Sequence, residues 1–327
     1  MPVEIADWND LDNVRNDLTG DYVLVNDLDS ETAGYAGIGD DFEPIGFIEG
    51  DSFTSEFGGS FDGDGFQISD LVIEYDNGGD IALFASTDTG ALIENVSVDG
   101  SVMVANADDF CYAGLVGFHT GGTIQNCVSH VDVTVPDGGR VGGLVGQNLE
   151  PVTDSYATGS VEGDNGVGGL LGMNSDTVTE SYATGSVEGN ERVGGLAGRN
   201  TDTITDSYWD TETTGQSGSA GGTGLTTAEM QGSEAETNMS GFDFANVWTS
   251  VVESDDDTTA DGYPILLAVD REQQLDAQGI LSLPAFTIRA LVNSESVEIQ
   301  DIFTQIDGEV KEVSEVFAQV DGESRQV

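Results

Sequence analysis

The sequence predicts an all-β protein, a parallel β-helix in which short strands stack coil upon coil. The first reason is an internal repeat: the string Val-Gly-Gly-Leu-X-Gly begins at Val141, Val167 and Val193, a step of 26 residues. A second string with the same step carries Tyr156, Tyr182 and Tyr208. A fixed period of this size is typical of a solenoid, in which one unit buries its apolar face only by stacking on copies of itself.

Each repeat has the pattern of strands rather than of a helix. Val178 lies between two threonines, and Ile204 does the same in the next repeat, so one face is apolar and the other polar. Gly-Gly and Thr-Gly-Ser corners interrupt the strands. One repeat is therefore expected to form one coil. Equivalent residues would stack at about 4.8 Å, with one ladder of tyrosines and another of leucines at 144, 170 and 196.

The repeated strings also carry a family resemblance. Gly-Gly-Leu-Val-Gly followed by Ser-Tyr-Ala-Thr-Gly-Ser-Val resembles the GLUG repeat family. That resemblance implies a right-handed parallel β-helix, of the type seen in filamentous adhesins and viral spikes, over roughly residues 5–267. It says little about function, because such repeats occur in many surface proteins.

Residues 1–20 are expected to cap the open end of the β-helix. Trp8 to Leu18 has apolar residues at spacings of three and four, Asp7 is a suitable N-cap, and Gly20 a suitable stop. These features predict a short amphipathic helix. A solenoid needs such a cap because its first coil would otherwise expose its core and a strand edge.

Residues 21–210 are expected to form the β-helix itself. It opens with a strand at 21–29 and with two strands around a turn at 62–65, and the next coils have longer steps than 26 residues. The additional residues would form loops at 103–110 and 135–140, and loops that break a repeat are favoured sites of function. We expect about six coils and a length of roughly 30 Å.

Residues 211–267 are expected to close the far end. The stretch 211–224 is rich in Gly, Ser and Thr and leaves the repeat. The aromatic strings at 242–248 and 262–266 resemble the closing elements that follow GLUG repeats and would plug that end. Residues 268–284 are expected to be a linker with some helix.

The C-terminal residues 285–327 hold a second repeat. The string from Ile302 to Glu309 returns from Val316 to Glu323, a step of 14 residues, and 288–299 is a degenerate third copy. Asp-Gly flanked by alternating apolar residues predicts β-hairpins. The string resembles the short Val-Asp-Gly repeats at the ends of tail and appendage proteins of tailed viruses. Because small hairpins are marginally stable alone, we expect this module to serve attachment or oligomerisation on partner chains.

The charge is strongly acidic, with 61 Asp and Glu against 8 Lys and Arg and a formal net charge of −53. One interpretation is a protein from an extreme halophile, in which multimolar salt screens the repulsion. The other is an acidic partner-binding tail. The first is favoured because the acidic residues are scattered rather than grouped in blocks.

The same composition excludes several partners. The chain has no basic patch for nucleic acid and no stretch of about 18 apolar residues for a membrane span. Residues 1–8 lack the basic and apolar regions of a signal peptide, so no export signal is expected.

No catalytic or cofactor-binding residues are predicted, and no metal site is assigned. Carboxylate pairs suited to glycoside cleavage carry no information in so acidic a chain. The string Asp62-Gly63-Asp64-Gly65 lacks the further ligands of a calcium loop and is expected to be a tight turn. Asp154, Glu180 and Asp206 would stack as like charges that either face solvent or share cations, and solvent is favoured. The tyrosine ladder could stack on sugars, but its members are expected to stack on each other.

The remaining candidate residues receive structural interpretations. Cys111 and Cys127 could form a disulfide; Cys127 is instead expected as a buried thiol, in the position that Tyr156 holds one coil later. His119 is expected in a loop, and His130 is the only other histidine. The sequons at Asn95 and Asn238 are attributed to chance.

Together these features predict a non-enzymatic virion structural protein of a haloarchaeal virus: a spike, tail fibre or turret subunit that contacts the host surface. It would assemble in the host cytoplasm as a homo-oligomer such as a trimer. It would bind other virion proteins through the C-terminal repeats, and a host glycoprotein or glycan. The alternative is a cell-surface adhesin of a halophilic archaeon. A lesser alternative is a polysaccharide depolymerase.

Overall fold

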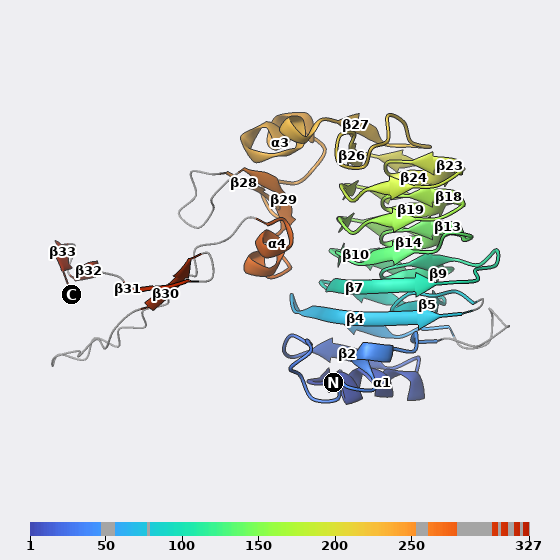
Figure 1. Ribbon diagram of the computed structural model, residues 1–327, viewed down its shortest axis with the longest axis horizontal. Helices are drawn as coiled ribbons and strands as arrows, with labels where there is room; N and C mark the ends of the chain where they lie inside the picture. The colour runs from blue at the N-terminus through green and yellow to red at the C-terminus, as the bar shows by residue number, and fades with distance from the viewer. Residues whose placement is uncertain are drawn as a thin grey trace. The chain divides into compact units, whose positions relative to one another are not determined.

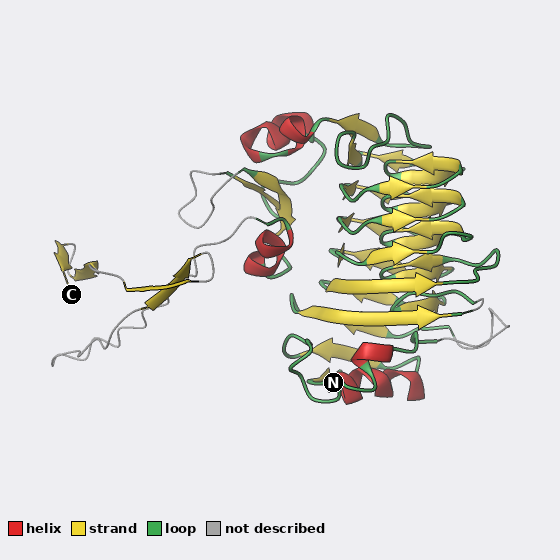
Figure 2. Cartoon of the chain, in the orientation of Figure 1, coloured by secondary structure: helices red, strands yellow, loops and turns green. Residues whose placement is uncertain are grey.

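The computed structural model describes residues 1–46, 56–76, 79–252, 261–279, 303–306, 309–312, 317–320 and 323–326. The chain divides into two compact units, 1–283 and 284–327. The larger unit is the predicted parallel β-solenoid (Figure 1). Strands make up most of it and helices are few (Figure 2).

The first wall of the solenoid is an eight-stranded parallel sheet, called sheet A. Its strands, in stacking order, are β1 (Val3–Ile5), β2 (Asp21–Leu24), β3 (Ser60–Asp62), β6 (Leu92–Glu94), β10 (Thr123–Gln125), β15 (Val152–Thr153), β20 (Val178–Thr179) and β25 (Ile204–Thr205). Val152, Val178 and Ile204 are paired in register. Val178 is buried while Thr177 is exposed and Thr179 is half-buried, which confirms the expected alternation.

The second wall, sheet B, has ten strands. They are β4 (Gln67–Tyr75), β7 (Ser97–Val104), β11 (Val128–Ser129), β12 (Asp132–Thr134), β16 (Tyr156–Ala157), β17 (Val161–Glu162), β21 (Tyr182–Ala183), β22 (Val187–Glu188), β26 (Tyr208–Asp210) and β27 (Thr223–Leu225). One long strand crosses this wall in the early coils, whereas two short strands do so later. Gly159 marks the break: a Cβ on it would lie 2.0 Å from the Val131 carbonyl oxygen, so only glycine fits.

The third wall consists of sheets C and D, which lie against each other. Sheet C contains β5 (Phe84–Thr87), β9 (Val116–His119), β14 (Val145–Asn148), β19 (Leu171–Asn174) and β24 (Ala197–Asn200); sheet D contains β8 (Tyr112–Ala113), β13 (Gly139–Gly142), β18 (Asn165–Gly168) and β23 (Glu191–Gly194). The last glycine of the repeated string permits this contact, because a Cβ on Gly172 would lie 2.4 Å from the Arg140 carbonyl carbon.

The solenoid has about five full turns, as the five strands of sheet C show, rather than the six expected. In the part of the chain that the structure describes, the residues before Phe84 add strands to sheet A and pair with sheet C through isolated bridges, such as that between Ile45 and Phe84. The repeat itself is in register throughout: Val141 pairs with Val167 and Val167 with Val193. Leu144, Leu170 and Leu196 are all fully buried, as the leucine ladder requires.

Residues in the left-handed conformation form the corner between sheets A and B. Asn95, Asn126, Asp154, Glu180 and Asp206 have φ between 46° and 54°. Short polar side chains tolerate this region better than others because they can bond to the local backbone. Glu180 is the one residue of this column whose side chain is longer than that of Asn or Asp.

The N-terminal cap contains α1 (Trp8–Asn13) and a 3₁₀ turn, η1 (Val14–Asn16), so the helix is shorter than expected. Asp7 is the N-cap, as predicted, and its side chain accepts from the backbone N–H groups of Asn9 and Asp10. A second 3₁₀ turn, η2 (Gly39–Asp41), follows β2.

The far end is closed by Trp209 and by the segment that follows it, not by the later aromatic strings. Trp209 pairs with Ala183 in register, and its ring occupies the core where earlier coils have alanine. The stretch 211–224 then covers the last coil: Ser219 Oγ accepts from the Leu196 and Ala197 N–H groups, at 3.2 and 2.9 Å. The Gly- and Ser-rich sequence therefore leaves the repeat, as expected. It supplies hydrogen-bond acceptors for backbone N–H groups at the edge of the last coil.

The aromatic strings cover the side of the solenoid instead. This covering layer consists of α2 (Thr227–Met230), α3 (Gly232–Asn238), β28 (Trp248–Val251), β29 (Gly262–Leu266) and α4 (Arg271–Ala277), which we call the closing segment. Figure 1 shows it beside the stack of coils. Its aromatic side chains pack against the tyrosine ladder in a hydrophobic cluster separate from the interior core. The expectation that they plug the end is wrong, because the tyrosines point outward from sheet B and need a cover.

The linker proposed at 268–284 contains α4, which belongs to the larger unit. Gln274 in this helix is fully buried, and its amide nitrogen donates to the carbonyl oxygens of Leu266 and Val269, both at 2.9 Å. Residues 268–279 are therefore part of the closing segment.

The described residues of the second unit form two antiparallel strand pairs, as the 14-residue repeat predicts. β30 (Phe303–Ile306) pairs with β31 (Glu309–Glu312), and β32 (Phe317–Val320) pairs with β33 (Glu323–Gln326). Both Asp-Gly turns and the degenerate copy at 288–299 lie outside the described residues. Across the described part of the chain, no helix is long and apolar enough to cross a membrane.

Candidate functional site

The tyrosine ladder is structural. Tyr156 and Tyr182 stack with ring centroids 4.6 Å apart and planes 5° from parallel, as expected. Both are fully buried, and their hydroxyls donate to Gln274 Oε1 and to the Pro264 carbonyl oxygen, at 3.0 and 2.7 Å. With the closing segment in place, this ladder offers no surface on which a sugar could stack.

The acidic column at the neighbouring corner is partly covered as well. Trp248 Nε1 donates to Asp154 Oδ1 at 3.1 Å, and the Asp243 N–H donates to Glu180 Oε2 at 3.4 Å. Burial, together with the charge of Asp154, raises the pKa of Glu180. Asp206 is exposed, whereas Asp154 and Glu180 are half-buried, so the column faces solvent as expected but is partly covered at Asp154 and Glu180.

The turn at Asp62 to Gly65 has the tight geometry expected. Asp64 and Gly65 both have positive φ, 49° and 87°, and the Asp64 N–H donates to Asp62 Oδ1 at 2.9 Å. The same oxygen accepts from Asn95 Nδ2 at 3.0 Å. Asn95, one of the two sequon residues, is therefore part of a packed corner.

Neither cysteine forms a disulfide, and both are buried free thiols. The position given to Cys127 was wrong: Val128 pairs with Tyr156, and Cys127 lies in the column of Ser155. The physical reason is that the corner joining sheets C and A is one residue shorter in the next coil. His119 pairs with Asn148, a step of 29, whereas Ile124 pairs with Val152, a step of 28.

Both histidines are buried parts of the walls. His119 ends β9, so its placement in a loop was wrong, and its Nδ1 is 2.7 Å from Thr87 Oγ1. His130 Nδ1 is 2.6 Å from Thr158 Oγ1. Burial lowers the pKa of each imidazole to about 4, so both are neutral at pH 7.

An internal asparagine ladder continues the column of His119. Asn148 Nδ2 donates to Asn174 Oδ1 at 2.8 Å, and Asn174 Nδ2 donates to Asn200 Oδ1 at 2.9 Å. Sequence reasoning missed this ladder, although all three asparagines follow the 26-residue period.

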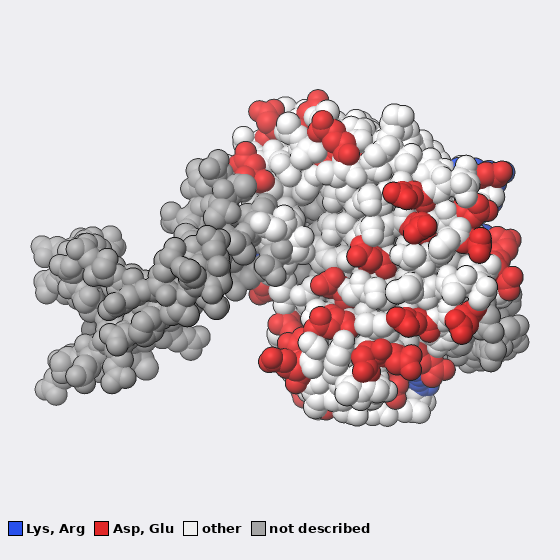
Figure 3. Space-filling view, in the orientation of Figure 1, with Lys and Arg blue, Asp and Glu red and all other residues white. Residues whose placement is uncertain are grey.

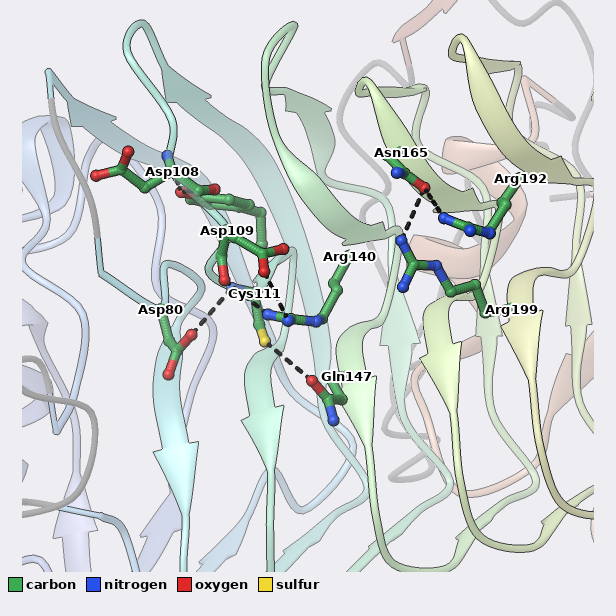
Figure 4. Close-up of polar contacts among 10 residues, drawn as sticks. Asp80, Asp108, Asp109, Cys111, Arg140, Gln147, Asn165, Arg192 and Arg199 are labelled. Atoms are coloured by element: carbon green, nitrogen blue, oxygen red, sulfur yellow. Dashed lines mark hydrogen bonds and ion pairs between the residues drawn. The ribbon is translucent and has the colours of Figure 1, made fainter.

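One face of sheets C and D carries an unusual concentration of polar side chains (Figure 4). It lies where the two loops expected at 103–110 and 135–140 meet, since Arg140 Nη2 is 3.1 Å from Asp109 Oδ2. A small pocket of about 240 Å³ opens here. Its lining includes Asp80, Asp109, Cys111, Arg140 and Gln147.

The pocket contains a buried carboxyl group next to a buried thiol. The Cys111 N–H donates to Asp80 Oδ1 at 2.9 Å, and the Cys111 thiol lies 3.8 Å from Gln147 Oε1. Burial is the main cause that raises the pKa of Asp80 to about 6, and burial raises the pKa of Cys111 well above its usual range. The thiol is therefore protonated at neutral pH, which makes it a poor nucleophile.

The substitution Asp80→Asn is expected to stabilise the protein above pH 6. Because the folded pKa exceeds the unfolded value of 3.8, ionised Asp80 destabilises the fold. The penalty is absent below about pH 3.8, grows as the pH rises to 6, and reaches up to about 3 kcal/mol above it. Thermal unfolding of both proteins at pH 7.5 and pH 4 would check this. An equal gain in melting temperature at the two pH values would contradict it.

Beyond this pocket, three arginines converge on the same face. Arg192 Nη1 and Arg199 Nη2 both donate to Asn165 Oδ1, at 3.0 and 2.8 Å (Figure 4). With Arg140 they make up what we call the arginine cluster. Three of the eight basic residues of the chain thus lie on one face. On the face that Figure 3 shows, acidic side chains are far more numerous than basic ones.

Comparisons with known proteins support the fold and one relationship. No protein-family model matches the chain. The chain is 34% identical over 146 residues to "Halomucin" of the haloarchaeon Haloquadratum walsbyi, which corresponds to 43% of this chain. The matched part spans only 2% of Halomucin.

Among solved structures, one from Bacteroides ovatus is described as a "putative immunoglobulin A1 protease". It superimposes with a TM-score of 0.52 and 18% identity, covering 82% of this chain and 93% of that chain. At this identity the likeness shows the fold alone. The chain is thus a parallel β-solenoid protein distantly related to haloarchaeal Halomucin, and the GLUG resemblance and the viral origin stay predictions.

Proposed function

We propose that this protein is a non-enzymatic structural and adhesive component of the haloarchaeal cell surface. The observation that carries the proposal is the similarity to Halomucin, since that relative belongs to a cellular organism rather than a virus. The match is also a small part of a far longer protein, which suits a repeat module used within extended surface proteins.

The chemistry of the described residues supports a structural role. The tyrosine ladder is covered by the closing segment, and the asparagine ladder is internal. Both histidines are neutral and buried, and the Cys111 thiol is protonated. Acidic side chains are scattered over the visible face (Figure 3), which suits a surface that faces concentrated salt. The solenoid would act as a rigid spacer that presents its exposed faces to other surfaces.

The second candidate is a virion structural protein of a haloarchaeal virus, and the C-terminal hairpins favour it. β30–β31 and β32–β33 form two copies of one small antiparallel unit. Two-stranded hairpins are marginally stable alone, so we propose that they pair with partner chains, including further copies of this protein.

Immunogold electron microscopy in high salt distinguishes the two candidates. Antibody raised to this chain is expected to label the envelopes of uninfected halophile cells that encode it. Label confined to virus particles would overturn the cell-surface proposal and favour the virion. If the purified protein released reducing ends from surface polysaccharide, it would be an enzyme. That result would contradict the non-enzymatic role in both the cell-surface proposal and the virion proposal.

A further inference from the structure

The arginine cluster has no assigned role, and its construction is unusual for so acidic a chain. Arg140 comes from β13, Arg192 from β23 and Arg199 from β24. Arg140 and Arg192 both have positive φ, 57° and 53°, so each side chain leaves its strand at an irregular point. The three residues therefore come from two coils, with Arg192 and Arg199 on the same coil and Arg140 two coils earlier, and they meet on one face.

A glycine makes room for the third guanidinium. The pairing of Gly139 with Asn165 and of Asn165 with Glu191 places Gly166 between Arg140 and Arg192 in the stack. A Cβ on Gly166 would lie 3.2 Å from Arg199 Nε. The side chain of Arg199 thus extends over the position where Gly166 has none.

The cluster is short of hydrogen-bond acceptors. Each guanidinium carries five N–H donors. Arg192 and Arg199 share the single Asn165 Oδ1, and Arg199 Nε is buried without a hydrogen-bond partner. Within the described part of the chain, no carboxylate lies within 4.0 Å of Arg199, although Glu191 is 4.0 Å from Arg192.

The charges in the cluster also oppose one another. Burial is the main cause that lowers the pKa of Arg199, and the charges of Arg192 and Arg140 lower it further. Asp109 already pairs with Arg140 and Glu191 lies 4.0 Å from Arg192, so the surplus of positive charge lies on Arg199. A bound anion with several acceptor oxygens would remove both the repulsion and the shortage of acceptors.

The position of the arginines suits a polymer rather than a single ion. Arg192 is exposed at 55% of its side chain, so it is open to a large ligand. Arg140 and Arg192 lie two coils apart along the stack, about 10 Å at strand spacing. That separation is close to the length of two sugar residues in an extended chain.

We propose that the arginine cluster binds the carboxylate or sulfate groups of an acidic polysaccharide that runs along the stack of coils. Arginine suits this task because its planar fork matches both groups in two-point contacts. The net charge of −53 repels a polyanion at low salt. At about 1 M salt the Debye length falls to roughly 3 Å, so the repulsion from distant acidic residues is screened. Binding then depends on the direct contacts that the three arginines make with the polymer.

The test is isothermal titration calorimetry of the full chain in about 2 M KCl with three probes. Polygalacturonate supplies carboxylates, dextran sulfate supplies sulfates, and dextran is the neutral control. We expect binding to one or both acidic polymers and none to dextran, and the polymer that binds identifies the group. No binding of either acidic polymer would overturn the proposal.

Variants locate the site. The double variant Arg192→Gln/Arg199→Gln is expected to lower the affinity at least about tenfold, because two charge-assisted contacts are lost. Arg192→Gln alone keeps the test valid if the double variant fails to fold, since Arg192 is exposed. Arg15→Gln removes one guanidinium charge, as Arg192→Gln does, but in the N-terminal cap. Its affinity for the acidic polymer is expected to stay within about twofold of the wild-type value. An equal loss in Arg15→Gln would overturn the proposal.

Discussion

Acidification from pH 7 to pH 4 is expected to remove several kcal/mol of stability that the β-solenoid owes to His119 and His130, because both are buried in the neutral form. Their exposed fractions are 0% and 8%. Burial lowers the pKa of each from 6.5 to about 4; for His119, Asp176 and the Pro151 carbonyl oppose this shift but do not cancel it. Burial is the only cause for His130.

The sign follows from proton uptake. Between pH 6.5 and pH 4 the unfolded chain binds protons on both imidazoles while the folded chain does not. The stabilising contribution is therefore complete above pH 6.5 and is lost as the pH falls through this window. Each histidine accounts for about 3 kcal/mol at the acid end, or about 6 kcal/mol together. Thermal or denaturant unfolding at constant high salt, between pH 7.5 and pH 4, measures the effect.

The variant His119→Asn is the matched control. It would continue the asparagine ladder of Asn148 and Asn174 into the preceding coil, so the fold is expected to be retained. It removes one buried imidazole and should abolish about half of the loss on acidification. This comparison separates the histidines from the many carboxylates, which titrate equally in both proteins. An unchanged pH dependence in His119→Asn would show that the buried imidazole is not responsible.

The substitution Trp248→Ala is expected to cost about 3–5 kcal/mol and to release the closing segment from the tyrosine ladder. Trp248 is fully buried, with its ring centroid 4.5 Å from that of Phe242 and 5.7 Å from that of Tyr182. Its Nε1 also donates to Asp154. Truncation removes the centre of this cluster and leaves a cavity. Denaturant unfolding measures the loss, and limited proteolysis is expected to cut within 226–279 first.

Trp248→Phe separates packing from hydrogen bonding. It keeps an aromatic ring against Phe242 and Tyr182 but loses the bond to Asp154, so we expect a cost of about 1 kcal/mol and an intact closing segment. If Trp248→Ala is cut no faster than the wild type at 226–279, this tryptophan does not hold the segment in place.

The repeated elements were predictable because stacking is a local rule applied many times. Residues one period apart must pair in a parallel solenoid, so a step of 26 residues determined the register of Tyr156 with Tyr182 and of Val141 with Val167. The Asp7 N-cap and the C-terminal hairpins were equally local, since a capping side chain and a hairpin involve only neighbouring residues. The asparagine ladder could have been found by the same reasoning.

The candidate sites were not predictable in this way. The arginine cluster depends on Gly166 leaving space for a side chain from another coil, and the pocket at Asp80 depends on how two irregular loops meet. Cys127 was misplaced because a corner one residue shorter shifts the register, which no regular period reveals.

The sequence by itself determined that this protein is a parallel β-solenoid, in which coils stack one period apart, with an N-terminal cap and C-terminal hairpins. Only the tertiary structure decided that the tyrosines face outward, that the closing segment covers them, and that Trp209 closes the end. The physical reason is that a period specifies which residues are equivalent but not which way they point. That direction depends on non-repeating segments whose burial is settled by contacts distant in the chain.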